Sequence, residues 1–580
     1  MKTAVCGLGK CGSRMVLDLS ALIYGGKYSC QLRSVKENLL EKGWFKVLLD
    51  KFKNKPRLFA RDLADDEVPP MHLGDSDDQN EVLNMCNMES GDEKDEERRK
   101  RLKEGMIIFN NYHDACGQYH IIGEEVMRNL FKTDSGLRDR IINKYINLNN
   151  KDNISAYFIL FSAGGGTGCG TSTILAEEIA ARVKEQHHNM LIAGVTAFPG
   201  DKEAVNYKIS AGRFLTKFLS STRSTSFDTV FTVSNSIMES IEADQTEAQT
   251  EANMFVAHLI FSIINSSSKY NRSTVNPDGP ELRKNIHGLA YFCFAQQAPD
   301  KTDESDLIGV DLLRKALAPV SSARFFDASN PELISFEGAS INFTDGDSFT
   351  RDNWDAMLKK IEQYRDFVRD AESDSPDVKG DAQALEAKLG ELFDNPKKQL
   401  PLATRSCKNV VILRGIPDGK KSSNWEQTCL TTLVEAVFPK ARVHYYATYH
   451  RMKEHTLTLL PSDYLSGEIV DLLVAYLTNV WEKEADPDDV VDMLLAVNDA
   501  VSENDISEIF GENEIFERYF PDFPDIREKT SGRFKLNDDI WDERYIKAPQ
   551  VADMMNNVHE IVANTGRVKK ERKRRRELDI

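Results

Sequence analysis

A run of five glycines in seven residues is the feature that most constrains how this chain can fold. The segment Gly164-Gly165-Gly166-Thr167-Gly168-Cys169-Gly170 lies between an apolar stretch, Ala156 to Phe161, and a helix-like stretch, Thr173 to Val183. Glycines let the backbone turn sharply and bring its N–H groups close to an anion, and the following helix points its positive N-terminal end at the same place. The segment therefore predicts a phosphate-binding loop between a buried strand and a helix.

Hydroxyl groups accompany this loop. Thr167, Thr171 and Ser172 are expected to add side-chain donors to the backbone N–H groups. A flexible linker is the alternative interpretation of a glycine-rich run, but linkers rarely connect a buried strand to an amphipathic helix.

A second glycine loop stands near the N-terminus. Gly7-Leu8-Gly9-Lys10-Cys11-Gly12 follows the strand-like Thr3 to Cys6 and precedes the helical Ser13 to Leu22, so it matches the GxGxxG dinucleotide fingerprint. That fingerprint expects an acidic residue about 20 residues further on, at the end of a second strand, whereas this chain continues as a polar segment through Gln31 to Lys42. A nicotinamide-dependent enzyme remains an alternative hypothesis. The P-loop sequence GxxxxGK[ST] is not present.

Together the two loops resemble the GTP site of the tubulin/FtsZ superfamily, in which a glycine loop after the first strand and a GGGTGxG loop after the fourth grip one nucleotide. The resemblance implies an α/β fold: a Rossmann-like GTPase domain with a parallel sheet, a central helix, a second α+β activation domain and a C-terminal helical extension. It also implies that GTP or GDP is bound by residues of both loops, namely Gly7, Gly9, Lys10, Cys11, Gly12, Gly164, Gly165, Gly166, Thr167, Gly168, Cys169 and Gly170.

Base recognition is the next feature that the resemblance implies. Asn235, after the strand-like Asp228 to Val233, stands where the family places an asparagine that reads the guanine edge, and Asn253 matches a second contact on the central helix. Two amides can supply donors and acceptors whose loss penalises the wrong base. Gln249 occupies a position where relatives often carry a stacking aromatic residue. Either asparagine alone could instead be a helix cap or a surface amide.

Weaker matches fill the remaining loops of the nucleotide site. Asp62 is a candidate for the Mg²⁺ and ribose side, and Gly117 lies where the γ-phosphate-sensing loop belongs, although the surrounding sequence departs from the family patterns. Pro199 matches the ribose-side loop, and Glu203 is a candidate contact to the sugar.

The segment after the central helix bears on hydrolysis. Asn276, Asp278 and Glu281 match in register the NxDxxD loop with which FtsZ-type relatives complete the site of the neighbouring subunit, with glutamate in place of the second aspartate. Two carboxylates that orient a water in line with the γ-phosphate, with Mg²⁺ bridging the phosphates, suffice for phosphoryl transfer. A proline- and glycine-rich acidic turn without catalytic function is the alternative.

Because the family donates these carboxylates from one subunit into the next, the resemblance implies a head-to-tail homopolymer that forms an open filament. Hydrolysis is then activated by polymerisation and in turn limits it. A non-hydrolysing relative that binds GTP and regulates another filament remains an alternative hypothesis.

The order of the expected elements resembles the domain organisation of the superfamily, with insertions added. We expect a GTP-binding domain over 1–245, with an insertion at about 72–105, and a central helix and linker over 246–275. An activation domain over 276–461, with an insertion at about 346–405, precedes a helical C-terminal extension over 462–580. Within that extension, Gly467 to Trp481 and Pro487 to Val501 are expected helices.

Charge and composition add expectations about partners and location. The formal net charge is −18, yet the segment from Arg567 to Ile580 holds eight basic and three acidic residues, with the basic ones at 567–576. Such a tail on an acidic body is suited to an acidic adaptor, a DNA-bound adaptor or an anionic membrane surface, or it is simply a solvated end. Nine cysteines without metal-ligand spacing and the lack of an apolar membrane-spanning run predict a cytoplasmic protein with reduced thiols.

Overall fold

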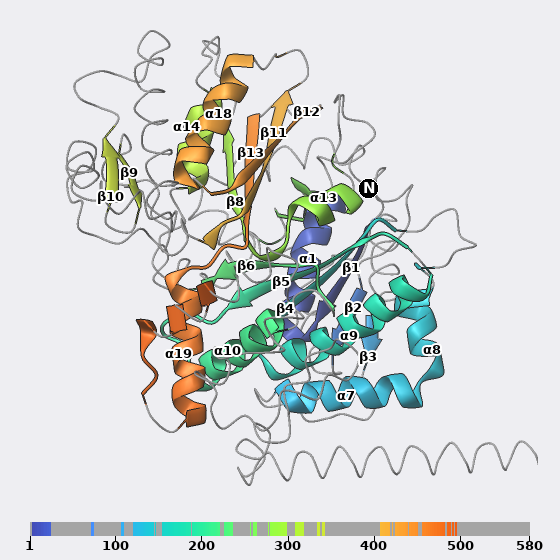
Figure 1. The fold of residues 1–580 in the computed structure, drawn as a ribbon. Coiled ribbons are helices and arrows are strands. Elements are labelled where there is room, and N and C mark those ends of the chain that lie inside the picture. Colours follow the sequence, from blue (N-terminus) through green and yellow to red (C-terminus); the bar gives the residue numbers. More distant parts are fainter. Residues whose placement is uncertain are drawn as a thin grey trace, which may run out of the picture. The chain divides into compact units, whose positions relative to one another are not determined.

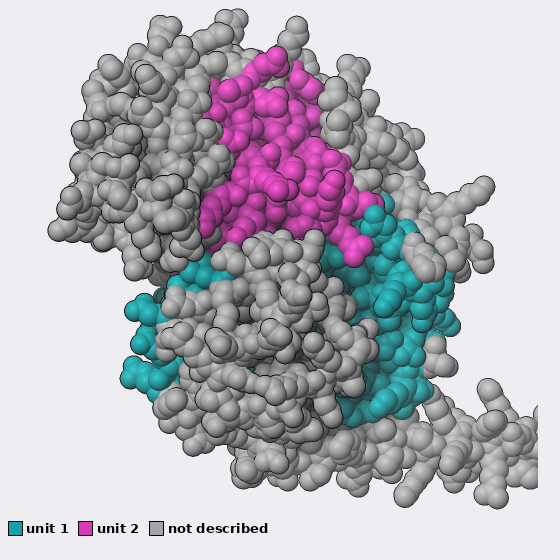
Figure 2. Space-filling view, in the orientation of Figure 1, with its two compact units in different colours: residues 1–257, 471–580 teal, residues 258–470 magenta. Residues whose placement is uncertain are grey.

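The computed structural model divides into two units, residues 1–257 with 471–580 and residues 258–470, which are coloured separately in Figure 2. It describes residues 3–24, 71–74, 106–108, 120–146, 154–220, 226–235, 279–297, 308–317, 333–342, 406–450 and 455–491, with short gaps inside several ranges, and isolated residues between 256 and 277 and at 494–495.

The first unit is built around a parallel sheet (Figure 1). Its strands run in the order β3-β2-β1-β4-β5-β6, and every neighbouring pair is parallel. Their bounds are β1 (Thr3–Leu8), β2 (Met71–Gly74), β3 (Met106–Ile108), β4 (Ala156–Ser162), β5 (Leu191–Phe198) and β6 (Thr229–Ser234). All residues of β5 and all but the last of β4 are buried, as expected for central strands of a sheet covered by helices. The α/β class with a mostly parallel sheet is confirmed.

Helices connect these strands and cover the sheet. They are α1 (Gly9–Tyr24), α7 (His120–Thr133), α8 (Ser135–Arg138), the π-helical turn Asp139–Asn143, α9 (Gly166–Glu185) and α10 (Val205–Ser220). Helix α1 packs on β1 and β4, and α7 lies along α9. Apolar side chains fill the layer between the sheet and the helices; for example, the Phe161 ring of β4 contacts the Phe214 ring of α10 edge to face, with 5.1 Å between centroids.

The expected central helix is described only in part. Val256, Leu259, Ile260 and Ile263 are helical and fully buried, which agrees with the apolar pattern of the sequence.

The second unit combines parallel and antiparallel strands. Strand β11 (Asn409–Pro417) pairs in parallel with β12 (Arg442–His450) and antiparallel with β13 (His455–Ser462). Strand β13 also pairs antiparallel with β7 (Gly288–Tyr291) and β8 (Cys293–Gln297). The helices of this unit are α13 (Gly279–Asn285), α14 (Ile308–Leu317) and α18 (Asn424–Val437). Strands β9 (Leu333–Phe336) and β10 (Ala339–Asn342) form a separate antiparallel pair.

Helix α19 (Gly467–Trp481) matches the helix expected from the sequence at both ends. Its residues from Asp471 onward belong to the first unit, where it packs against α10. A Cβ atom on Gly212 of α10 would collide with the Leu472 carbonyl oxygen and with Tyr476, so this glycine allows the two helix backbones to approach closely.

Parts of the expected organisation lie outside the described residues. These are most of the insertion at 72–105, the insertion at 346–405 and the basic tail, and the helix expected from Pro487 to Val501 is described only at a few positions. Residues 71–74, where the first insertion was expected to begin, form β2 and pair with β1. Among the described residues, no helix is long and apolar enough to cross a membrane.

Candidate functional site

The two glycine loops are in direct backbone contact, although Gly9 and Gly168 are 159 positions apart in sequence. Gly9, which begins α1, has a φ of +65°, and a Cβ atom on it would lie 3.0 Å from the Gly168 nitrogen. A Cβ atom on Gly168 would lie 2.7 Å from the Leu8 carbonyl oxygen. A side chain at either position would collide with the other loop, and at Gly9 the positive φ also disfavours any residue with a Cβ atom. The two glycine loops therefore form one cradle.

The position of this cradle follows from the strand order. Strands β1 and β4 are parallel neighbours, with Gly7 opposite Leu160. From β1 the chain order continues outward through β2 and β3, whereas from β4 it continues in the other direction through β5 and β6. Loops that leave the carboxyl ends of two such strands diverge, and ligands of open α/β sheets bind at this switch point. Both glycine loops leave the sheet there.

The start of α9 presents backbone N–H groups to which the helix itself gives no partner. Its N-cap is Gly165, in extended conformation with φ −85° and ψ 149°, and this residue has no side chain that could cap the helix. The first N–H groups of a helix have no partner within the helix, and the helix dipole adds positive potential at this end. Together with the glycines of the first loop, this arrangement fits the phosphates of a nucleotide.

The structure corrects one part of the expected donor set. The Thr171 hydroxyl donates to the Thr167 carbonyl oxygen at 2.6 Å, and the Ser172 hydroxyl donates to the Cys169 carbonyl oxygen at 2.8 Å. Both residues are fully buried. The expectation that these two hydroxyls face the anion was wrong, because bonds back into the helix satisfy them locally.

Helix α7 packs closely against the same loop. A Cβ atom on Gly123 would lie 2.5 Å from the Gly166 carbonyl oxygen, and one on Gly170 would collide with the backbone of α7. The two helices can touch only because both contact positions are glycine. Gly170 is therefore a packing residue as well as a member of the cradle.

The two residues expected on the ribose and base side are bonded to each other. Glu203 Oε1 accepts hydrogen bonds from Asn235 Nδ2 at 2.9 Å and from the Gly200 nitrogen at 3.2 Å. Asn235 follows β6 and is 7% exposed, and its Oδ1 atom is buried with no hydrogen-bond partner among the described residues. Because the carboxylate can only accept here, it fixes the amide with its NH₂ group toward Glu203.

For three other predicted residues of the nucleotide site the structure gives the position and the burial, and six more lie outside the described part of the chain. Pro199 is buried after β5, whereas Lys10 is exposed and Cys11 is half-buried in the first turn of α1. Asp62, Gly117, Gln249, Asn253, Asn276 and Asp278 lie outside the described residues.

The thiols near the cradle are not set up for chemistry. Burial raises the pKa of the Cys6 thiol far above its ordinary value, and Cys169 is 2% exposed. A thiol in such surroundings is not ionised at neutral pH and packs as a small apolar group. Within the described part of the chain, no three His, Cys, Asp or Glu side chains are grouped so as to hold a metal ion.

The third predicted catalytic residue is held by contacts that the sequence analysis did not find. Glu281 lies in the first turn of α13, half-buried. Its Oε1 atom accepts a hydrogen bond from the Tyr446 hydroxyl of β12 at 2.9 Å, and Asn285 Nδ2 donates to the same hydroxyl at 2.9 Å. The three residues form a chain from amide to phenol to carboxylate. No sequence signal links Tyr446 to Glu281, because they are 165 positions apart.

Electrostatics around Glu281 are mixed. His444, two positions before Tyr446 on β12, has its pKa lowered mainly by burial, then by the positive charge of Arg442; Glu281 opposes this shift, and Lys284 adds to it. The His444 ring therefore feels the Glu281 carboxylate and two cationic side chains at once.

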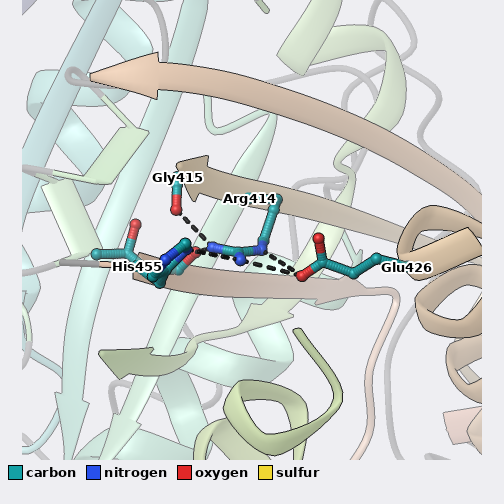
Figure 3. A network of polar contacts seen from close by, with 5 residues as sticks. Arg414, Gly415, Glu426 and His455 are labelled. Carbon is teal, nitrogen blue, oxygen red and sulfur yellow. Dashed lines mark hydrogen bonds and ion pairs between the residues drawn. The ribbon is translucent and has the colours of Figure 1, made fainter. Parts of the chain in front are cut away.

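A second buried network of the same unit was also missed (Figure 3). Arg414 of β11 is 2% exposed and donates from Nε and Nη2 to Glu426 Oε1 of α18, at 3.1 and 3.0 Å. Its remaining N–H groups reach the carbonyl oxygens of Gly415 and Thr456 and the Nδ1 atom of His455. Because arginine can only donate, His455 Nδ1 is the acceptor and its ring is neutral.

The known proteins to which this chain is similar are tubulin-like. No family model matches the chain. The tubulin-like protein CetZ of Pyrococcus horikoshii is 24% identical over 124 residues, which are 21% of this chain and 32% of that protein. The chain is similar to proteins of the tubulin/FtsZ superfamily.

The match to CetZ spans about a third of that protein's length. Among solved structures, CetZ from Methanosaeta thermophila aligns with a TM-score of 0.46 at 13% identity, over 89% of this chain and 97% of that one. A protofilament of CetZ2 from Haloferax volcanii with bound GTPγS aligns with a TM-score of 0.43 at 12% identity, over 82% and 97%.

Proposed function

We propose that this chain is a GTPase that binds GTP between its two glycine loops and assembles head to tail into filaments. The observation that carries the proposal is the backbone contact between Gly9 and Gly168 at the switch point of the parallel sheet. This contact joins the glycine loop after β1 and the GGGTGxG loop after β4 into one site, which fits the triphosphate of a nucleotide.

The bond between Glu203 and Asn235 supports guanine as the base. Since the Asn235 NH₂ group is held by Glu203, its unpartnered Oδ1 is the atom left to accept a hydrogen bond. Guanine carries N–H donors on the edge where a single acceptor can bind. A base without such donors would leave this buried oxygen unpaired, which costs about 1–3 kcal/mol.

Hydrolysis is proposed to need a second subunit. Asp278 and Glu281 of one subunit would orient a water against the γ-phosphate held by the next, so that the water oxygen bonds to phosphorus and GDP leaves. When bound, Mg²⁺ supplies neutralisation of the phosphate charges, and Asp62 is the candidate protein group beside it. The residues of one chain thus supply either the nucleotide cradle or the water-orienting carboxylates of a given site.

Two measurements test the proposal. Phosphate release from GTP should rise more than linearly with protein concentration, and light scattering should increase with GTP but not with GDP. Asp278→Ala and Glu281→Ala should abolish turnover while filaments persist. The matched control is Glu185→Ala, at the exposed end of α9, where the side chain is 65% exposed. Unchanged turnover in both carboxylate variants would reject the mechanism.

A further inference from the structure

The hydrogen bond between Tyr446 and Glu281 has a defined direction. A phenol carries a single proton, and Asn285 Nδ2 donates to the Tyr446 oxygen at 2.9 Å. The hydroxyl proton is therefore directed to Glu281 Oε1, also at 2.9 Å. A hydrogen bond to a carboxylate is shorter and stronger than one between neutral groups. Tyr446 thus holds Glu281 through a charge-assisted bond whose polarity Asn285 sets.

The support behind this bond is rigid. Tyr446 and Asn285 are each 8% exposed. Tyr446 lies on β12, opposite Leu413 of β11 in a ladder of nine residue pairs. Asn285 and Glu281 are four positions apart on α13, so they lie on the same face of the helix. Two buried side chains on regular elements therefore restrict a half-buried carboxylate.

Glutamate at position 281 needs such a restraint more than aspartate would. The resemblance noted above places aspartate at this point, and glutamate adds one methylene and therefore one rotatable bond. A carboxylate that moves by about 1 Å from the productive geometry can lose a factor of ~100 in rate. A fixed hydroxyl removes the added freedom of the longer arm.

We propose that Tyr446 is a positioning residue for GTP hydrolysis, which holds the Glu281 carboxylate in the orientation that polarises the attacking water of the neighbouring subunit. This inference rests on the proposed function. Tyr446 acts through Glu281 and not on the nucleotide, since its one hydroxyl proton is already donated to the Glu281 carboxylate.

The test is a double-mutant cycle on the full chain, with turnover measured per polymerised subunit after sedimentation. Tyr446→Phe removes only the hydroxyl and should lower kcat about tenfold, with the KM for GTP unchanged. In a Glu281→Asp background the shorter arm no longer reaches the phenol, so Tyr446→Phe should have no further effect. Tyr449→Phe, on the opposite face of β12 by the alternation of a strand, is the matched control.

The outcomes separate positioning from general stability and from the underlying function. Thermal unfolding of each variant shows whether the fold is weakened. Wild-type kcat in Tyr446→Phe, or the same loss of kcat in the Glu281→Asp background, would overturn the inference while the proposed function stands. A wild-type protein that polymerises but never releases phosphate would overturn both.

Discussion

The two units place their functional groups by different physical means. In the first unit the cradle is made of backbone, and the requirement is the absence of side chains at positions such as Gly9 and Gly168. In the second unit Glu281 is held by one side chain from a distant strand, Tyr446, and Arg414 is held by side chains from a helix and a second strand. A site made of backbone can be recognised from a short sequence motif. A network of side chains cannot, because its members come together only in the completed fold.

The largest expected effect comes from the charged network of the second unit. Arg414→Met leaves the Glu426 carboxylate buried without its cation, which should lower the free energy of unfolding of that unit by about 3–5 kcal/mol. Urea denaturation measures the change. Arg140→Met serves as the control because its ion pair with Asp134 is 2.8 Å long but exposed, and such pairs contribute about 0–1 kcal/mol. If both variants lose the same free energy of unfolding, the buried network of Arg414 is no more important for stability than an exposed ion pair.

The cradle of the first unit should respond to a single methyl group. Gly168→Ala places a Cβ atom 2.7 Å from the Leu8 carbonyl oxygen, and such overpacking costs about 1–3 kcal/mol, partly offset by the better helix propensity of alanine. GTP affinity, measured by calorimetry, should fall at least about tenfold, the equivalent of 1.4 kcal/mol.

Gly165→Ala is the matched substitution in the same loop. A Cβ atom there would lie 3.7 Å from the nearest atom, the Ser162 carbonyl oxygen, so the loop has room for it. Alanine is a poorer N-cap than glycine by about 1 kcal/mol at most, so GTP affinity should fall by less than about fivefold. If both alanines weaken binding equally, backbone contact between the loops is not what shapes the cradle.

A smaller effect is expected where the first unit also uses side chains. Glu203→Ala removes the carboxylate that holds the Asn235 amide, so the amide oxygen is no longer fixed toward the base. The loss of one such bond, about 1 kcal/mol, should reduce the preference for GTP over ATP several-fold in competition binding. Glu185→Ala is the control. An unchanged preference would show that the orientation of Asn235 does not contribute to base selection.

The smallest effect is confined to alkaline solution. Burial, followed by the nearby Cys6 thiol, raises the pKa of Tyr145 to about 12. Between about pH 10 and this value the unfolded chain loses a proton that the folded chain keeps, so the free energy of unfolding falls as pH rises through this window. Tyr145→Phe should make that fall shallower and leave stability near pH 7 almost unchanged. Parallel curves for wild type and variant in urea titrations would contradict this.

The sequence predicted the parts of the molecule that depend on local pattern. The strands before both glycine loops, the helix after each and the bounds of α19 follow from apolar periodicity and glycine position. The contact between Gly9 and Gly168 was expected only through the family resemblance.

The side-chain arrangements could not be predicted in the same way. The bond of Asn235 to Glu203 spans 32 positions, and that of Tyr446 to Glu281 spans 165. Residues so far apart are not neighbours on one helix or one strand, so no local pattern pairs them. They come together only when the chain has folded. The hydroxyls of Thr171 and Ser172 were misassigned for the opposite reason, because a helix offers its own carbonyl oxygens as local acceptors.

Helix α19 bears on how the protein is made. Its residues from Asp471 onward pack in the first unit through the close approach at Gly212 of α10. During synthesis, the ribosome must therefore complete residues 258–470 before the last contacts of the first unit can form. Domains generally fold as units as they emerge, so we expect the second unit to mature first. A nascent chain truncated before α19 would expose the α10 surface that this helix covers and would be a substrate for chaperones.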